Sequence, residues 1–320
     1  MAKRETAMII YIDTPFKEEQ KTLLRSTLKA DELIFKDELP SDDERLSSLL
    51  KADILLGNPK PVDWLQQAQN LKWLQLYSTG FEYYSGVKIP AVVTNMKAYY
   101  AQPCAETIVA GIMALYRGID KYDTLKSQGR WVGYQAREKL QLLFQKKVII
   151  LGAGGIAKHL GNILSGFDCG VTFFARSAGE ATLHTIEDLE KAIPDADIII
   201  GTLPGTKETA GLFTTAMINK MNADALFCNI GRGNLVEDEA VLIDALITGK
   251  IGGAVLDVTA REPIPEGHPL WDCPNTILTQ HSGGGSTTEY DGIAAFFLEN
   301  LERFKQGNRL KNVVDLAKGY

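Results

Sequence analysis

The chain has 320 residues, of which 45% are hydrophobic and 23% are charged, and its formal net charge is -6. This is the composition of a globular protein long enough to form two domains. The negative charge argues against nucleic acid as the main partner, because phosphate binding requires clustered lysine and arginine. The apolar runs are much shorter than a membrane-spanning helix, and the first of them predicts a strand rather than a signal peptide.

The first hundred residues predict short strands that alternate with helices. Residues 17–28 and 61–68 fit helices, and Pro61 stands at the start of the second, where a missing N–H is tolerated. Apolar runs predict strands at 7–13, 32–35, 53–57, 71–77 and 92–94. Strands separated by helices in this way indicate βαβ units and a parallel sheet.

A long helix is expected over residues 103–117, and a glycine-rich strand–turn–helix follows at 148–166. The strand is a run of large apolar residues, as in a central parallel strand covered on both faces. Gly152, Gly154 and Ala157 then occupy the small positions of the pattern G-x-G-x-x-G/A. The first permits a tight turn, the second lets a pyrophosphate approach the backbone, and the third lets the helix pack on the strand.

The amides at the start of this helix, which include those of Gly155 and Ile156, would face the phosphates of a dinucleotide. Because strand, turn and helix occur in order, the segment predicts a dinucleotide-binding unit. The alternative is a plain strand–helix turn, since tight turns of this kind are common in α/β proteins.

The alternation of strands and helices continues after the glycine turn. Strands are expected at 171–174, 197–202, 225–229, 253–257 and 276–278. Helices are expected between them, including one at 237–248, and a last helix at 293–306 has an apolar face that predicts core packing. A whole α/β unit precedes the glycine motif and a helix follows the last strand, so we expect an inserted cofactor domain. The expected domains are 101–286 for dinucleotide binding and 1–100 with 287–320 for substrate binding, with an active-site cleft where the chain crosses.

The residues after the second strand of this domain bear on the choice of cofactor. An NAD site usually has Asp or Glu there to bind the ribose 2′-hydroxyl, whereas this chain has Ala175, Arg176 and Ser177. An arginine binds a 2′-phosphate through charge-assisted hydrogen bonds, and the serine adds another. We therefore favour NADP(H) over NAD(H). In the alternative, Arg176 is a solvated loop residue, Glu180 supplies the carboxylate and NAD(H) is the cofactor.

Three segments with chemically useful side chains follow three of the later strands, at the ends where such sheets place ligands. They contain Arg232 in a glycine-flanked turn, Asp257 with Glu262, and His281. Taken singly, a turn arginine is usually solvated, a glutamate before proline is often a surface residue, and a lone histidine is more often structural. Their order along the chain is more informative than any one of them.

The ordered set resembles the D-isomer-specific 2-hydroxyacid dehydrogenase family over nearly the whole chain. The resemblance rests on the mid-chain glycine loop, Leu203-Pro204 with Thr206 and Thr209, Arg232-Gly233, Asp257 with Glu262, and His281. The C-terminal Asn312-Val313-Val314-Asp315 with Gly319-Tyr320 is similar to the short NADP-linked members. The resemblance implies a Rossmann-type doubly wound parallel sheet domain inserted into a smaller flavodoxin-like α/β domain. It also implies a homodimer, with residues 103–117 and 129–135 in the interface.

The same resemblance implies NADPH-dependent, reversible reduction of a small 2-oxo acid to the D-2-hydroxy acid. Arg232 would bind the carboxylate and carbonyl oxygens, and His281 would protonate the carbonyl oxygen as hydride arrives. Glu262 would bond the other imidazole nitrogen, fix its tautomer and favour the charged form of the ring. The amides of Thr79 and Gly80 would hold the substrate carboxylate.

The remaining expectations concern the cofactor cleft and departures from the family pattern. Asp257 would contact the carboxamide side of the nicotinamide, and the cleft would be lined by Thr202, Leu203, Pro204 and Ile230. No metal site is expected. The family's usual Thr-Pro-His is Thr-Gln-His here, which predicts a less rigid loop before His281. Candidates for the pocket, with core packing as the favoured interpretation, are Phe81, Tyr83, Tyr100 and Trp131.

Cysteine usage and the rival functions complete the sequence-based expectations. The four cysteines are Cys104, Cys169, Cys228 and Cys273. They are scattered without a Cys-x-x-Cys pair, which favours a reduced, cytoplasmic protein, and Cys104 is expected to be buried rather than nucleophilic. Two rivals to the 2-oxo acid reductase stay open. One is a non-catalytic, dinucleotide-sensing protein of the same fold, and the other is a family enzyme that oxidises a different small acid.

Overall fold

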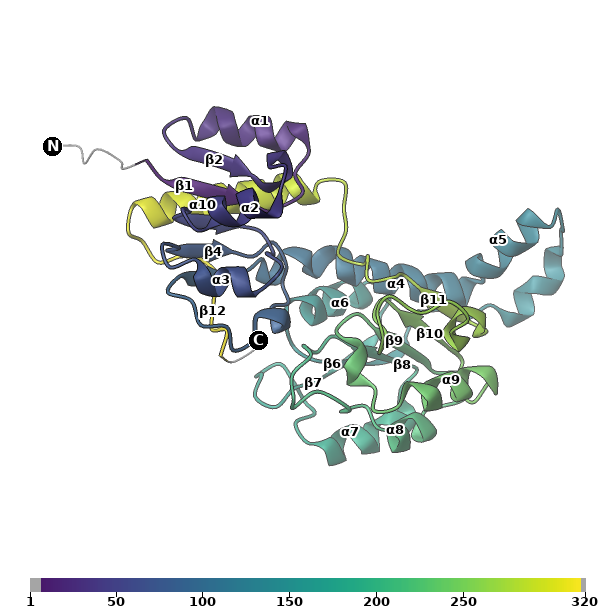
Figure 1. The fold of residues 1–320 in the computed structure, drawn as a ribbon. Helices are drawn as coiled ribbons and strands as arrows, with labels where there is room; N and C mark the ends of the chain where they lie inside the picture. The colour runs from purple at the N-terminus through teal and green to yellow at the C-terminus, as the bar shows by residue number, and fades with distance from the viewer. Residues whose placement is uncertain (1–6, 318–320) are drawn as a thin grey trace. The chain divides into compact units, whose positions relative to one another are not determined.

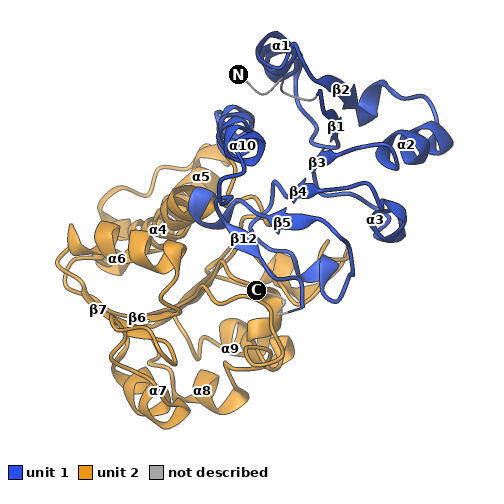
Figure 2. Cartoon of the chain, turned by 90° about the vertical axis from the view of Figure 1, so that its left-hand side faces the viewer, with its two compact units in different colours: residues 1–99, 286–320 blue, residues 100–285 orange. Residues whose placement is uncertain are grey.

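The computed structural model describes residues 7–317, which fall into two compact units. Of these residues, unit 1 comprises 7–99 and 286–317, and unit 2 comprises 100–285 (Figures 1 and 2). Within residues 7–317, no helix combines the length and the apolar character that are needed to cross a bilayer.

Unit 1 contains a six-stranded sheet in the order β12-β5-β4-β3-β1-β2. Its strands are β1 Ile9–Ile12, β2 Glu32–Phe35, β3 Ile54–Leu56, β4 Trp73–Gln75, β5 Val92–Thr94 and β12 Val313–Val314. Its helices are α1 Glu18–Thr27, α2 Asp42–Leu49, α3 Asp63–Gln67 and α10 Glu289–Lys305. The first five strands are parallel and β12 is antiparallel to β5. The order 2-1-3-4-5 of the parallel strands is flavodoxin-like, which confirms the expected fold of this unit.

Helices cover both faces of the unit 1 sheet (Figure 2). Leu49 of α2 and Leu65 of α3 pack against β3 and β4 in one core cluster. On the other face, Trp73 of β4 stacks on Phe297 of α10 with ring centroids 5.2 Å apart. The apolar face of the last helix therefore packs in a core, as its spacing predicts.

Unit 2 contains a second six-stranded sheet, in the order β11-β10-β9-β8-β6-β7, and all its pairings are parallel. Its strands are β6 Lys147–Leu151, β7 Gly170–Phe174, β8 Ile198–Gly201, β9 Leu226–Asn229, β10 Gly253–Leu256 and β11 Thr276–Leu278. Its helices are α4 Ala101–Arg117, α5 Ile119–Ser127, α6 Gly155–Ser165, α7 Ile186–Ala192, α8 Thr215–Lys220 and α9 Glu239–Ile247. Short 3-10 helices in the chain cover Lys36–Glu38, Glu82–Tyr84, Lys97–Tyr100, Gly133–Lys139, Ile193–Asp195, Gly233–Leu235 and Pro269–Asp272.

The unit 2 sheet is buried on both faces. Alternate residues of β6 point to opposite sides: Val148 and Ile150 pack with α4 and α6, whereas Ile149 and Leu151 pack with α7, α8 and α9 (Figure 2). A strand covered on both faces must be apolar throughout, which is why the sequence around 148–151 does not alternate. This arrangement confirms the doubly wound, Rossmann-type sheet.

Among the α-helices and strands of residues 7–317, three were not predicted from the sequence: α2, α5 and β12. The signal for α2 is present, because Ser41 and Glu44 form the pattern Ser-x-x-Glu and the Ser41 hydroxyl accepts a hydrogen bond from the Glu44 amide at 3.3 Å. β12 has only two residues, and it pairs with β5, which lies more than 200 residues earlier in the chain. A local sequence pattern therefore does not predict this strand.

Residues 119–139 extend away from the sheet of unit 2 (Figure 1). This segment, which we call the arm, exposes the large apolar side chains of Ile119, Trp131 and Tyr134. Trp131 is 95% exposed, so the expectation that it packs in the core is wrong. The reason is its position on an arm that lies beyond the helices that cover the sheet.

Candidate functional site

The candidate site residues of unit 2 follow the carboxyl ends of its strands. The strand ends are aligned in one row, in which neighbouring residues are Phe174, Leu151, Gly201, Asn229, Leu256 and Leu278. Because all six strands are parallel, the segments that follow this row emerge at one edge of the sheet, which is where doubly wound folds bind ligands. Each candidate follows its strand end by at most three residues along the chain. The candidates are the glycine turn, Arg176, Thr202, Arg232, Asp257 and His281.

The glycine turn has the geometry of a phosphate-binding loop. Gly152 has a φ of 122°, and a Cβ there would lie 2.5 Å from the Thr202 Oγ1, so glycine is required. A Cβ on Gly154 would meet nothing within 4 Å, which leaves open space beside the turn. Helix α6 begins at Gly155, and the fully buried Ala157 lets it pack closely. The first amides of an α-helix have no partner within the helix, so this end fits the pyrophosphate of a dinucleotide.

The residues after β7 present a cation at the edge of the sheet. Arg176 and Ser177 are exposed. Glu180, the alternative ribose ligand, forms an ion pair with Lys158 of α6 at 2.9 Å. A hydrogen bond from Thr206 and, more weakly, the positive charge of Arg176 lower the pKa of Glu208. The charge of Arg176 therefore acts on the turn that follows β8.

The turn after β8 is held by a small hydroxyl network. The Thr209 hydroxyl accepts a hydrogen bond from the Thr206 amide at 2.9 Å and donates one to the Pro204 carbonyl. Thr202 donates its hydroxyl to the Leu151 carbonyl at 2.9 Å, which ties the turn to the glycine strand. Thr202 and Leu203 are half-buried and Pro204 is exposed, so these three residues border the strand-end edge.

Arg232 stands in a turn that is held by the buried side-chain amide of Asn229, a residue that was not among the predicted site residues. Asn229 is 1% exposed; its Oδ1 accepts from the Gly231 amide at 3.1 Å and its Nδ2 donates to the Arg232 carbonyl at 2.9 Å. A Cβ on Gly233 would lie 1.8 Å from the Thr259 carbonyl oxygen, so this turn packs directly on the segment after β10. A polar residue that ends a buried apolar strand is the signal that points to Asn229.

His281 and Glu262 form a direct pair. The His281 Nδ1 lies 2.6 Å from the Glu262 Oε2, and the Glu262 Oε1 accepts from the Thr259 amide at 3.0 Å. With Glu262 ionised, Nδ1 is the nitrogen that carries hydrogen, which leaves Nε2 to act on a ligand. Half of the His281 side chain is exposed, so a small molecule can reach it.

Asp257 holds the loop that carries His281. Its Oδ1 accepts hydrogen bonds from the Thr279 hydroxyl at 2.5 Å, the Ser282 amide at 3.1 Å and the Gly283 amide at 2.9 Å. Its backbone carbonyl accepts from the His281 amide at 2.6 Å. Asp257 is 4% exposed, so this carboxylate is satisfied mainly by the loop, a role that the sequence did not indicate.

The structure gives a physical reason for glutamine before His281. Gln280 and His281 both have a φ of 55°, in the left-handed region. A proline cannot adopt this conformation, because its ring fixes φ near -65°. The bonds to Asp257, rather than a proline ring, therefore hold this segment.

The predicted carboxylate loop of unit 1 follows β4. Ser78 donates its hydroxyl to the Gly80 carbonyl at 2.7 Å, Thr79 donates to the Lys97 carbonyl at 2.8 Å, and Asn95 Nδ2 donates to the Thr79 carbonyl at 2.6 Å. Within residues 7–317, no acceptor is found for the backbone N–H of Thr79 or of Gly80. Two such neighbouring amides can bind an anion.

Several other candidates lie elsewhere. Phe81 is buried in the core of unit 1, whereas Tyr83 is 58% exposed, with the Lys60 ammonium 4.9 Å from its ring centroid. Burial raises the pKa of the Cys104 thiol to about 12, so this cysteine is not poised as a nucleophile. In the described part of the chain, no group of three His, Cys, Asp or Glu side chains could hold a metal ion. Gly319 and Tyr320 lie outside the described residues.

Comparison with known proteins identifies the family. Residues 109–283, more than half of the chain, match the model of the D-isomer specific 2-hydroxyacid dehydrogenase NAD binding domain. The chain belongs to this family. As a 2-hydroxyacid dehydrogenase, it is an NAD(P)-dependent oxidoreductase that acts on CH–OH donors.

Relatives of this 2-hydroxyacid dehydrogenase cover most of its length. It is 30% identical over 287 residues to a probable 2-ketogluconate reductase of Dictyostelium discoideum, covering 86% of this chain and 85% of the relative. It is 29% identical over 284 residues to a glyoxylate/hydroxypyruvate reductase B of Escherichia fergusonii, covering 85% and 87% of the two chains. A solved family member from Aeromonas salmonicida is 26% identical, with a TM-score of 0.84 and coverage of 97% and 99%.

Proposed function

We propose that this dehydrogenase reduces a small 2-oxo acid to the D-2-hydroxy acid with NADPH, and that His281 supplies the proton. The observation that carries the proposal is the His281–Glu262 pair, 2.6 Å apart. His281 follows β11 and Glu262 follows β10, and β10 lies between β11 and β9, the strand that leads to Arg232. Reduction of a carbonyl needs a proton donor and a cation for the substrate oxygens. These side chains provide both.

Each side chain has a distinct part in the proposed reaction. Arg232 binds the substrate carboxylate and carbonyl oxygen with its planar fork, because two parallel N–H donors match two oxygens. His281 donates the proton at Nε2 to the carbonyl oxygen and takes it back in the reverse direction. Glu262 orients the ring through Nδ1. The amides of Thr79 and Gly80 are proposed as further ligands of the substrate carboxylate.

The cofactor proposal is NADP(H), with NAD(H) as the alternative. When bound, the nicotinamide supplies or accepts the hydride. The open space beside Gly154 and the start of α6 support a pyrophosphate at this point. The residues proposed to hold the cofactor are Gly152, Gly154, Gly155, Ile156, Arg176, Ser177, Thr202, Leu203, Pro204, Ile230 and Asp257.

The proposed function is tested by the oxidation of NADPH in the presence of glyoxylate, hydroxypyruvate or pyruvate, followed at 340 nm. We expect turnover with at least one of these acids and a D configuration of the product. NADPH binding without turnover of any 2-oxo acid would instead favour a dinucleotide-sensing protein.

Replacing Arg176 with alanine tests the cofactor preference. We expect the Kd for NADPH to rise at least about tenfold, because a charge-assisted hydrogen bond to the 2′-phosphate is lost. The Kd for NADH should stay unchanged, since NADH has no such phosphate. Lys191→Ala, which removes an exposed cation of α7, is the matched control. An unchanged ratio of the two Kd values would remove Arg176 from the 2′-phosphate site.

We also propose that the protein is a homodimer, with the arm at the interface. The arm exposes Trp131 and Tyr134 almost fully, and an exposed aromatic surface of this kind is typical of protein–protein contacts. Sedimentation velocity measures the oligomeric state directly. A monomer at micromolar protein concentration would contradict the proposal.

A cytoplasmic location is proposed from the cysteines. All four are free thiols, and three of them are buried. Unpaired cysteines are typical of a reducing compartment. Cell fractionation tests the location, and recovery outside the cytoplasmic fraction would exclude it.

A further inference from the structure

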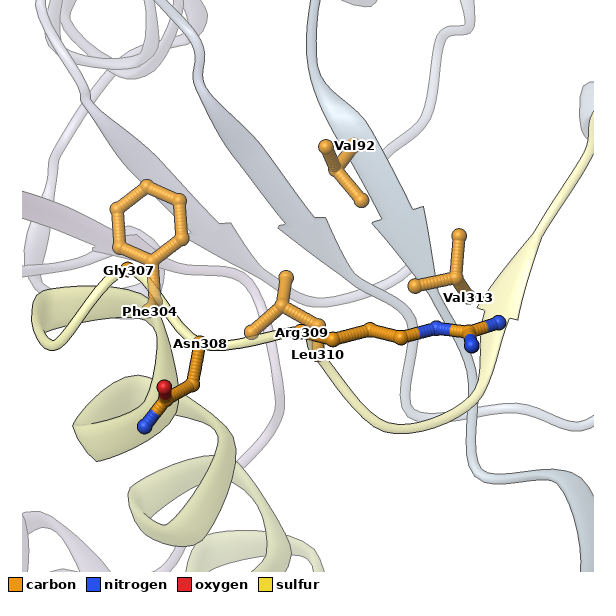
Figure 3. Close-up of a pocket in the computed structure, with 7 residues that line it drawn as sticks. All are labelled: Val92, Phe304, Gly307, Asn308, Arg309, Leu310 and Val313. Atoms are coloured by element: carbon orange, nitrogen blue, oxygen red, sulfur yellow. The ribbon is translucent and has the colours of Figure 1, made fainter.

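The motif Asn312-Val313-Val314-Asp315 has no part in the reaction proposed above. Val313 and Val314 form β12, in which Val313 pairs with Thr94 and Val314 with Val93 of β5. Figure 3 shows β12 beside β5, where Val92 and Val313 line one shallow hollow. Continuing this antiparallel register by one step brings Asn312 opposite Asn95, the residue that follows β5.

Asn312 bonds both backbone groups of Asn95, its N–H and its carbonyl. The Asn95 amide donates to the Asn312 carbonyl at 3.2 Å, and the Asn312 Nδ2 donates to the Asn95 carbonyl at 3.1 Å. Asn312 has a φ of 54°, in the left-handed region that asparagine tolerates better than most residues. The residue type therefore suits both the backbone and the contact.

Asn95 in turn holds the loop proposed to bind the substrate carboxylate. Its side chain is 4% exposed; Nδ2 donates to the Thr79 carbonyl at 2.6 Å and Oδ1 accepts from the Lys97 amide at 3.1 Å. Thr79 closes the network by donating its hydroxyl to the Lys97 carbonyl at 2.8 Å. A chain of hydrogen bonds thus runs from Asn312 to the residue whose amide is a proposed ligand.

The segment that carries Asn312 is itself anchored. Asn300 of α10 is fully buried; its Oδ1 accepts from the Lys311 amide at 2.9 Å and its Nδ2 donates to the Lys311 carbonyl at 3.2 Å. On the other side, the Leu316 carbonyl accepts from the Gly86 amide at 3.2 Å, and Leu316 packs in the unit 1 core. Asn312 is therefore held between two fixed points and can act as a support.

We propose that Asn312 is a positioning residue, which orders residues 78–80 through Asn95 so that the amides of Thr79 and Gly80 keep a geometry able to bind a carboxylate. The identity of the ligand rests on the function proposed above. A preordered loop binds more tightly than one that must be ordered by its ligand, because the entropy cost is met during folding. The C-terminal motif would then act on substrate affinity without touching the substrate.

Asn312→Asp tests this proposal. Aspartate keeps the size of the side chain and tolerates a positive φ, but it cannot donate to the Asn95 carbonyl. We expect amide hydrogen exchange in residues 76–84 to become about tenfold faster, the effect of one lost part-buried hydrogen bond. The KM for the 2-oxo acid should rise about tenfold, while kcat and the Kd for NADPH change less than about twofold.

The matched control is Asn308→Asp, the same substitution on the segment before β12. Asn308 is exposed, and among the described residues its Nδ2 donates to the Gln306 Oε1 at 2.8 Å. This variant should leave the amide hydrogen exchange of residues 76–84 and the KM for the 2-oxo acid at their wild-type values. If Asn312→Asp fails to fold, Asn312→Gly keeps the left-handed backbone, removes the amide and serves the same comparison.

A second substitution tests whether the two asparagines act in series. Asn95→Asp removes the donation to the Thr79 carbonyl, and it should raise the KM as much as, or more than, Asn312→Asp. The double variant should be no worse than Asn95→Asp alone, since residues in one chain of contacts are not additive. Additive effects would indicate two separate structural roles and overturn the proposal.

The hydrogen-exchange measurement also has outcomes that would contradict the proposal. Wild-type exchange at residues 76–84 in Asn312→Asp, or faster exchange spread evenly over unit 1, would overturn positioning by Asn312. If the wild-type protein reduces no 2-oxo acid, the proposed function fails, whereas the exchange measurement still decides whether Asn312 orders the loop.

Discussion

His281→Ala is expected to lower kcat by roughly 1000-fold, because the proton donor to the carbonyl oxygen is lost. The Kd for NADPH should change less than about twofold, since the imidazole acts on the substrate and not on the nucleotide. Turnover is measured by NADPH oxidation and binding by the quenching of protein fluorescence. The difference between the two readouts distinguishes a catalytic histidine from a structural one.

The matched control for this prediction is His268→Ala. His268 also lies near a carboxylate, with its Nε2 3.6 Å from the Glu239 Oε2, but it belongs to the segment before β11. Its replacement should leave kcat near the wild-type value. Equal losses of turnover and NADPH affinity in His281→Ala would point to a structural role and exclude His281 as the proton donor.

Arg232→Lys is expected to lower kcat/KM by roughly 100-fold. Lysine keeps the positive charge but replaces a planar fork with a single ammonium, which cannot bind two substrate oxygens with parallel hydrogen bonds. Steady-state kinetics with the preferred 2-oxo acid measures the change, and circular dichroism shows whether the variant remains folded. The buried Asn229 should keep the turn in place, because it bonds only backbone atoms there.

Arg117→Lys serves as the control for Arg232→Lys. The Arg232 guanidinium donates to the Gly231 carbonyl at 2.7 Å, and that of Arg117 donates likewise to the Gln141 carbonyl at 3.2 Å. Arg117, however, stands at the end of α4. This control should retain activity. Near-normal kcat/KM in Arg232→Lys would remove the guanidinium from the substrate site.

Much of the fold could be predicted because its signals are local. The apolar run before Gly152 matches β6, and the predicted strands at 32–35, 92–94 and 276–278 have the bounds of β2, β5 and β11. Helix boundaries were less accurate. The helix predicted from residue 103 begins at Ala101, because Pro103 fits within the first turn, where no amide donor is needed.

The order of residues along the chain predicts which side chains follow the strand ends, but it does not predict their hydrogen-bond partners. Arg232, Glu262 and His281 could be chosen because each follows a predicted strand, and parallel strands end at one edge of their sheet. The functions of Asn229 and Asp257 as braces could not be predicted, since their partners depend on how neighbouring loops fold. The same applies to Asn95 and Asn312, which flank β5 and β12, two strands that lie far apart in the sequence and pair in the fold.

By itself, the sequence determined two α/β sheets, a glycine turn suited to a dinucleotide, and membership of the 2-hydroxyacid dehydrogenases. These features depend on hydrophobic period, turn chemistry and motif order, all of which are encoded within short segments. Only the tertiary structure decided that Asp257 holds the His281 loop, that glutamine suits the left-handed backbone at 280, and that Asn312 supports the loop at 79–80. The physical reason is that a hydrogen bond depends on distance and angle, which arise only when distant segments pack together.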